Sequence, residues 1–204
     1  MSPRLCLMLR RFLGDKRGSS AAEFGLLSVL FIGMFLGIID MGRYAWEFNS
    51  AKAATRAGAR LAVVSLMLPT YLQSYNALTS CASVTGNGQT VPASCVPTFT
   101  CSGATLTCPN AGGLNTAMDT TTFTKILNQM KAYYPRVAAA NVVVEYKHVG
   151  LGVSGNPYAP DVEPMITVKL TNLQFRPVAL RLFGNITFDI PPVRSTLSGE
   201  SLGA

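Results

Sequence analysis

The run Phe24-Gly-Leu-Leu-Ser-Val-Leu-Phe-Ile-Gly-Met-Phe-Leu-Gly-Ile-Ile39 contains no charged residue, and Gly18-Ser-Ser-Ala-Ala-Glu23 stands directly before it. A helix over these 16 residues is about 24 Å long, which is short for a hydrocarbon core of about 30 Å. Including residues 19–23 extends it to about 31 Å. The sequence therefore predicts a transmembrane helix over residues 19–39 that places Glu23 inside the bilayer or at its edge.

The carboxylate of Glu23 is the unusual group in this segment. Burying an acidic side chain costs about 2.5 to 3.5 kcal/mol at the bilayer centre and less near the interface. Such a residue indicates a function, and a partner for its charge.

Charge before the apolar run predicts the orientation of the helix. The leader, residues 1–18, carries five basic residues and one acid: Arg4, Arg10, Arg11, Lys16, Arg17 and Asp15. This bias places the N-terminus in the cytoplasm and the rest of the chain outside. Beyond the leader 12 basic and 9 acidic residues remain, a net charge of +3, with no basic tract interleaved with aromatics. We therefore expect no nucleic-acid binding.

Residues 40–68 extend the same helix in an amphipathic form. They contain no proline, and small or apolar residues recur at three- or four-residue steps from Met41 to Ser65. The charged residues Arg43, Glu47, Lys52, Arg56 and Arg60 fall elsewhere and predict a polar face. Pro69 is expected to end a helix that starts at Ser20, giving 49 residues and about 74 Å.

Small residues mark a strip along this helix. Gly33 and Gly37 are four residues apart, and Ala54, Gly58 and Ala62 repeat that spacing outside the membrane run. Such spacing lets helices approach closely, so the five residues predict packing against a helix of another subunit. The alternative is that glycine is common in membrane helices and alanine in any helix.

The outer part contains four cysteines within a span of 28 residues: Cys81, Cys95, Cys101 and Cys108. They predict two disulfides in an oxidising compartment, with three connectivities possible. A zinc site is the alternative, but no C-x-x-C pair is present and His148 is distant in sequence. We expect no metal and no cofactor.

The remaining segments predict an α+β fold. Residues 69–122, rich in Ser, Thr, Asn, Gly and Pro, read as a disulfide-stapled loop region. The last region, residues 123–204, is expected to hold a short helix and a sheet. The helix is capped at Asp119 and ends before Pro135. β-branched strands follow over 141–149, 165–171 and 185–190. The expected fold is a long N-terminal helix followed by a small domain with a three- or four-stranded antiparallel sheet.

Catalytic motifs are weak. Gly150-Leu-Gly-Val-Ser-Gly155 matches G-x-G-x-x-G, but Pro157 and Pro160 follow where a phosphate-binding helix should begin, so a strand connection is expected. We expect His148 to be a solvated strand residue. Asp161 and Glu163 lie in a proline-rich stretch without a companion base. We expect a protein that is not an enzyme.

The junction resembles a known family. The basic leader, Gly18, and Glu23-Phe24 four and five residues after Ser19 are similar to a type IV prepilin junction, above all that of tight-adherence (Tad) systems. Ala53-Ala-Thr-Arg-Ala-Gly-Ala-Arg-Leu-Ala62 resembles the segment after the membrane helix in TadE-like proteins. Pro164–Leu170 and Phe175-Arg-Pro177 are similar to that family's strand and the turn after it.

The resemblance implies a type IV pilin-like minor pilin or pseudopilin of a Tad (Flp) pilus, serving adhesion, biofilm formation or secretion. It implies cleavage after Gly18 by a prepilin peptidase, and a single-pass inner-membrane protein with a periplasmic domain that becomes extracellular in the pilus. The implied partners are other pilins and minor pilins, the inner-membrane assembly machinery and membrane lipid. Glu23 would pair with the ammonium of Ser19 in a neighbouring subunit. The chain is larger than a major Flp pilin, so it is not expected to be the main fibre subunit.

Two rival functions stay open at this point. A signal-anchored periplasmic binding or sensor domain explains the membrane run and the cysteines without using Glu23. A membrane-tethered enzyme is disfavoured because no catalytic constellation accompanies the anchor.

Overall fold

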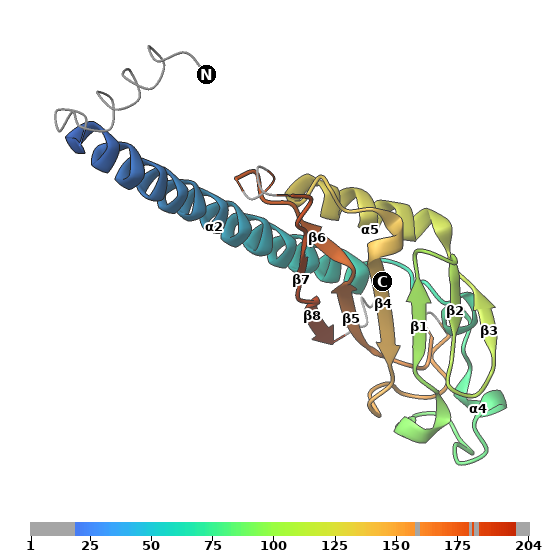
Figure 1. The fold of residues 1–204 in the computed structure, drawn as a ribbon. Helices are drawn as coiled ribbons and strands as arrows, with labels where there is room; N and C mark the ends of the chain where they lie inside the picture. Colours follow the sequence, from blue (N-terminus) through green and yellow to red (C-terminus); the bar gives the residue numbers. More distant parts are fainter. Residues whose placement is uncertain (1–18, 158–159, 180, 182–183, 199–204) are drawn as a thin grey trace, which may run out of the picture. The chain divides into compact units, whose positions relative to one another are not determined.

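The computed structural model describes residues 19–157, 160–179, 181 and 184–198. Figure 1 shows the order of its elements along the chain, from the long helix α2 (Ser19–Val64) to strand β8 (Val193–Ser198). The chain divides into two compact units. One holds the helix up to Tyr44 together with Pro177–Ile186, and the other holds Ala45–Arg176 and the residues from Thr187 on. The expected α+β class is confirmed.

Helix α2 has 46 residues and ends at Val64, four residues before the predicted end. Leu68 precedes a proline and is therefore disfavoured in the helical region. Its N–H donates to Tyr146 Oη at 3.1 Å, and its carbonyl accepts from the Asp119 N–H at 2.9 Å. Burial raises the pKa of Tyr146, so this hydroxyl stays protonated. The segment after Val64 is thus held by partners far along the chain.

Six antiparallel strands form the main sheet in the order β3-β2-β1-β4-β5-β8. Their bounds are Phe99–Ser102 (β1), Thr107–Pro109 (β2), Asn115–Ala117 (β3), Val142–Lys147 (β4), Met165–Leu170 (β5) and Val193–Ser198 (β8). Strands β4 and β5 fall where the β-branched runs predicted them. The third predicted run contributes β7 (Phe188–Ile190), which pairs with β6 (Leu173–Phe175) in a separate two-stranded sheet.

The predicted loop region 69–122 is more ordered than expected. It contains α3 (Thr70–Gln73), α4 (Ala77–Ser80), the 3-10 turn η2 (Ala93–Cys95) and the strands β1, β2 and β3. The loop prediction was wrong for these strands because they are short and largely polar in sequence, while pairing along the sheet determines their conformation: β1 pairs with β4, β2 with β1, and β3 with β2. Strand β1 pairs with β4 over four positions, from Phe99 opposite Tyr146 to Ser102 opposite Val143.

Both predicted disulfides form, with the connectivity Cys81–Cys95 and Cys101–Cys108. The first closes the segment between α4 and η2, and the second ties β1 to β2. The glycine-rich stretch after β4 is a connection rather than a phosphate loop. Gly152 has φ of +117°, and a Cβ there would clash with the backbone carbonyl of Asp161.

The core lies where one face of the sheet and α5 (Thr120–Tyr133) meet the outer half of α2. Alternate residues of β4 and β5 are buried, and so are the α5 side chains Phe123, Ile126 and Met130. A Cβ on Gly58 would lie 2.8 Å from Met130 Cγ and 3.6 Å from Val168 Cγ1. A larger residue at this position would force the Met130 side chain to shift, because helix, helix and sheet come this close.

This packing corrects part of the predicted helix strip. Ala54 and Ala62 have 0% exposure, and Gly58 is buried with them. These three residues face the chain's own domain instead of another subunit. Sequence spacing alone identifies a surface for close approach, and it does not say whether the approaching element belongs to the same chain.

Helix α5 begins as predicted. Asp119 is its N-cap, and one carboxylate oxygen accepts from the N–H groups of Thr121 at 2.9 Å and Thr122 at 3.2 Å. The other oxygen accepts from Thr122 Oγ1 at 2.8 Å. The bonds from Thr122 lower the pKa of Asp119, because they stabilise the ionised carboxylate.

We predict that Asp119→Ala lowers the free energy of unfolding by about 1 kcal/mol at pH 7, the usual value of an N-cap. The folded pKa is lowered, so the carboxylate stabilises the fold above its unfolded pKa of about 3.9 and ceases to do so as pH falls through the folded value. The gap between wild type and variant should therefore narrow below about pH 4. Denaturant unfolding of the full chain in detergent at several pH values measures it.

The matched control is Asp119→Asn, which keeps a capping oxygen without the charge. It should stay close to wild type at pH 7 and should lack the titration below about pH 4. Equal stability of the alanine variant and wild type at pH 7 would contradict the role of the cap.

Candidate membrane anchor and assembly surface

The apolar half of α2 is exposed on all sides. Among the described residues, one helix is long and apolar enough to cross a membrane, and only 6% of its most apolar window is buried. Large side chains here are exposed, for example Phe24 by 74%, Leu30 by 70% and Phe35 by 59%. The core helix of a soluble domain would be mostly buried. These features make α2 a candidate membrane anchor.

Gly33 and Gly37 lie on this exposed part of the helix. A Cβ built on either residue meets nothing within 4 Å. Of the five residues of the predicted strip, these two present an open surface, and their packing against another subunit stays a prediction.

The predicted processing junction lies at the edge of the described chain. Gly18 is outside the described residues, as is the rest of the leader, whereas Ser19 is the first residue of α2. Glu23 is exposed, and Phe24 beside it is among the most exposed apolar side chains. Both predicted contact residues thus lie exposed on the helix surface.

Asp40, the residue directly after the apolar run, fixes a distant segment to the helix. It is 6% exposed, and its two oxygens accept from the backbone N–H groups of Val178 at 2.9 Å and Ala179 at 2.8 Å. Arg43 Nη1 adds an ion pair to Asp40 Oδ1 at 3.5 Å. Backbone donors and a cation together offset the cost of burying this carboxylate.

Glu47 is a second buried acid on the same helix. Arg136 Nη1 donates to Glu47 Oε1 at 2.7 Å, while Glu47 Oε2 is buried with no hydrogen-bond partner among the described residues. Nearby, burial raises the pKa of Tyr134, and the Glu47 charge adds to this shift. The predicted polar face was wrong for Glu47, which lies four residues before the buried Ala51 and so continues the buried side of the helix.

Two residues weighed for catalysis have structural partners instead. His148 is buried, contrary to the expected solvated position, and its Nε2 lies 3.0 Å from the Val91 carbonyl. Asp161 is also buried. Its oxygens accept from the N–H groups of Ala77 at 2.8 Å, Gly155 at 3.0 Å and Asn156 at 3.1 Å. Both side chains hold neighbouring loops in place.

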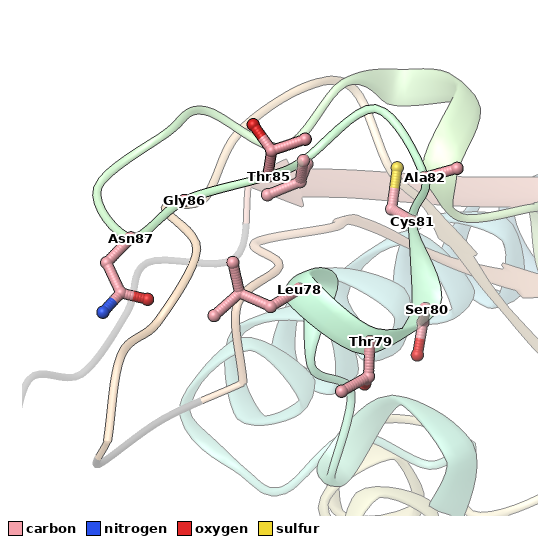
Figure 2. Close-up of a pocket in the computed structure, with 9 residues that line it drawn as sticks. Leu78, Thr79, Ser80, Cys81, Ala82, Thr85, Gly86 and Asn87 are labelled. Atoms are coloured by element: carbon pink, nitrogen blue, oxygen red, sulfur yellow. The ribbon is translucent and has the colours of Figure 1, made fainter.

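An open hollow lies beside the Cys81–Cys95 disulfide. Figure 2 shows Leu78, Thr79 and Ser80 on α4, with Thr85 and Asn87 on the loop that follows. Its lining is neutral and rich in hydroxyl groups. Within the part of the chain that the structure describes, no cluster of three potential metal ligands is found.

These features define an α+β protein in which an exposed apolar helix, the candidate membrane anchor, leads into a disulfide-stapled domain. The model of the family described as TadE-like protein matches residues 18–60. This match confirms the resemblance to that family over the anchor and the outer part of α2, and it supports a protein associated with the Tad pilus. No curated protein and no solved structure gives a significant match.

We predict that Arg136→Ala lowers the free energy of unfolding by about 1 to 3 kcal/mol, because it removes the donor to a buried carboxylate oxygen. The double variant Glu47→Gln/Arg136→Ala should recover part of this loss, since an amide costs less to bury than an anion. Denaturant unfolding of the full chain in detergent measures both.

Arg60→Ala is the matched control because Arg60 is an exposed arginine on α2. It should change stability by less than about 0.5 kcal/mol. If the Arg136 variant behaves like this control, the ion pair does not stabilise the fold.

Proposed function

We propose that the chain is a minor pilin or pseudopilin of a Tad (Flp) pilus, made as a prepilin and incorporated into the pilus or required for its assembly. The family match carries the proposal, because it starts at Gly18, the predicted cleavage residue, and runs through the exposed anchor. The same helix that anchors the precursor in the membrane becomes the packing surface in the assembly.

Processing creates a positive charge that complements Glu23. Hydrolysis of the peptide bond between Gly18 and Ser19 leaves a carboxylate on the leader and an ammonium group on Ser19. The Glu23 carboxylate of one subunit pairs with the Ser19 ammonium of the next. This pairing lessens the cost of burying both charges among apolar helices and sets the axial register of the subunits.

The outer domain serves as a structural and contact module rather than an enzyme. The charge bias of the leader places it in the periplasm, with the N-terminus in the cytoplasm, and pilus assembly carries it outward. Two disulfides suit these oxidising compartments. The buried acid Asp161 supports this role, because its oxygens are bound to the backbone N–H groups of Ala77, Gly155 and Asn156.

The first test is the N-terminus of the protein isolated from its native membrane. We expect the intact mass and the N-terminal sequence to show a chain that begins at Ser19, because the peptidase cuts after Gly18. A strain without the prepilin peptidase is the control and should yield the uncut chain. A protein that keeps residues 1–18 in the wild-type strain contradicts the prepilin function.

The second test concerns Glu23. Glu23→Ala should leave membrane insertion and cleavage intact but reduce the pilus-associated fraction of the protein at least tenfold, the effect of about 1.4 kcal/mol on an assembly equilibrium. Quantitative immunoblotting of sheared pili and membranes measures it. Glu23→Asp, which keeps the charge, is the matched control and should assemble better than the alanine variant. Unchanged assembly of Glu23→Ala refutes the charge pairing.

The hollow beside the Cys81–Cys95 disulfide favours a second candidate, a signal-anchored periplasmic binding or sensor domain that never enters a filament. The two functions differ in the N-terminal measurement, because a sensor retains its leader as an ordinary anchor. They also differ in the sheared-pilus fraction, from which a sensor is absent.

A further inference from the structure

We propose that Val178, Ala179, Arg181 and Ile186, described residues of the stretch that is tethered to Asp40, form a second membrane contact. In this contact Val178 and Ile186 enter the lipid interface and Arg181 faces the phosphate groups. The inference rests on the proposed function in one respect, namely that α2 spans a membrane. It adds a lipid-binding surface from a part of the chain that lies more than a hundred residues after the anchor.

The tether at Asp40 lies at the depth of the membrane surface. Asp40 follows Ile39, the last residue of the apolar run, so it lies about 25 Å along the helix from Glu23. With Glu23 at one edge of a hydrocarbon core of about 30 Å, Asp40 lies close to the opposite edge. The N–H groups of Val178 and Ala179 are within 2.9 Å of its carboxylate. The tether therefore holds these two residues at the level of the membrane surface.

The side chains at this level are apolar and exposed. Val178 is 62% exposed although its own N–H is bound to Asp40, and Ile186 at the end of the same segment is 39% exposed. On the helix, Ile39 and Met41 flank Asp40 with exposures of 45% and 70%. All four belong to one compact unit. The apolar surface of the anchor thus continues onto the tethered segment, which favours lipid as its occupant.

The charged groups of this surface also favour lipid. Arg181 is exposed in this unit, and its guanidinium suits lipid phosphate groups. The negative charge of Asp40 is turned inward, bound by two backbone N–H groups and paired with Arg43. The surface therefore presents apolar groups and a cation, the composition of an interfacial membrane contact.

Tryptophan quenching tests the proposal in the full chain, reconstituted in phosphatidylcholine vesicles with brominated acyl chains. Trp46 is the only tryptophan, so Trp46→Phe gives a silent background. In that background Val178→Trp should be quenched from a depth of about 5–10 Å into the headgroup and acyl boundary. Adding Asp40→Ala should weaken this quenching, because it removes the acceptor that holds the segment.

Two further positions make the outcomes distinguishable. Leu30→Trp reports on the anchor and should be quenched most strongly, whereas Leu114→Trp, at an exposed apolar position of the other unit, should not be quenched. Quenching at Leu30 without quenching at Val178 overturns this inference and leaves the anchor intact. No quenching at Leu30 overturns the anchor, and the inference with it.

Three other outcomes would contradict the proposed lipid contact or the role of the tether. If the tryptophan at position 178 is shielded from both brominated lipid and aqueous acrylamide, a second protein copy covers it and the lipid contact is wrong. If its quenching is the same with and without Asp40, the tether does not position the segment. Strong quenching at Leu114 as well would show general adsorption of the chain and overturn a specific contact.

Discussion

The close approach of α2 to α5 and the sheet at Gly58 is the contact on which the rest of the domain depends. A side chain at this position would collide with Met130, and both neighbouring turns of α2 also present small buried residues, Ala54 and Ala62. Because the helix comes so near, alternate residues of β4 and β5 are sealed from water. The Tyr146 hydroxyl, carried by β4, can then bind Leu68 and fix the path of the chain after α2.

One continuous helix, α2, has two different surroundings, and its buried acids lie where the first gives way to the second. The first part of α2 exposes its apolar side chains on all sides, which suits lipid or other apolar helices, while the outer part buries one face against the domain. Asp40 and Glu47 stand between these parts. Backbone N–H groups and Arg43 compensate the first acid, and Arg136 compensates the second. A carboxylate at such a boundary needs partners that its own helix cannot fully supply.

Local patterns predicted the elements that local forces specify. The apolar run, the cap at Asp119 and the β-branched runs of β4 and β5 each act over a few residues, so α2, α5 and both strands were found. Strands β1 to β3 are short, and β8 is largely polar. Their conformation follows from pairing along the sheet, in which β1 pairs with β4, β2 with β1, β3 with β2 and β8 with β5. Non-local contacts also determine the burial of Glu47, the tether at Asp40 and the choice among three disulfide connectivities. The alanine and glycine spacing was correct as a packing surface, but the partner at Gly58 lies in the same chain.

The two disulfides have a consequence for export. Each joins a cysteine to the next one in sequence, with separations of 14 and 7 residues, and neither loop encloses the other. In a chain that crosses the membrane in vectorial order, Cys81 meets Cys95 before Cys101 emerges, and Cys108 follows to complete the second bond. Each native bond thus joins two cysteines that emerge one directly after the other, so pairing in the order of emergence gives the native connectivity. In that order of emergence, both bonds can form before strands β5 and β8 follow to complete the sheet.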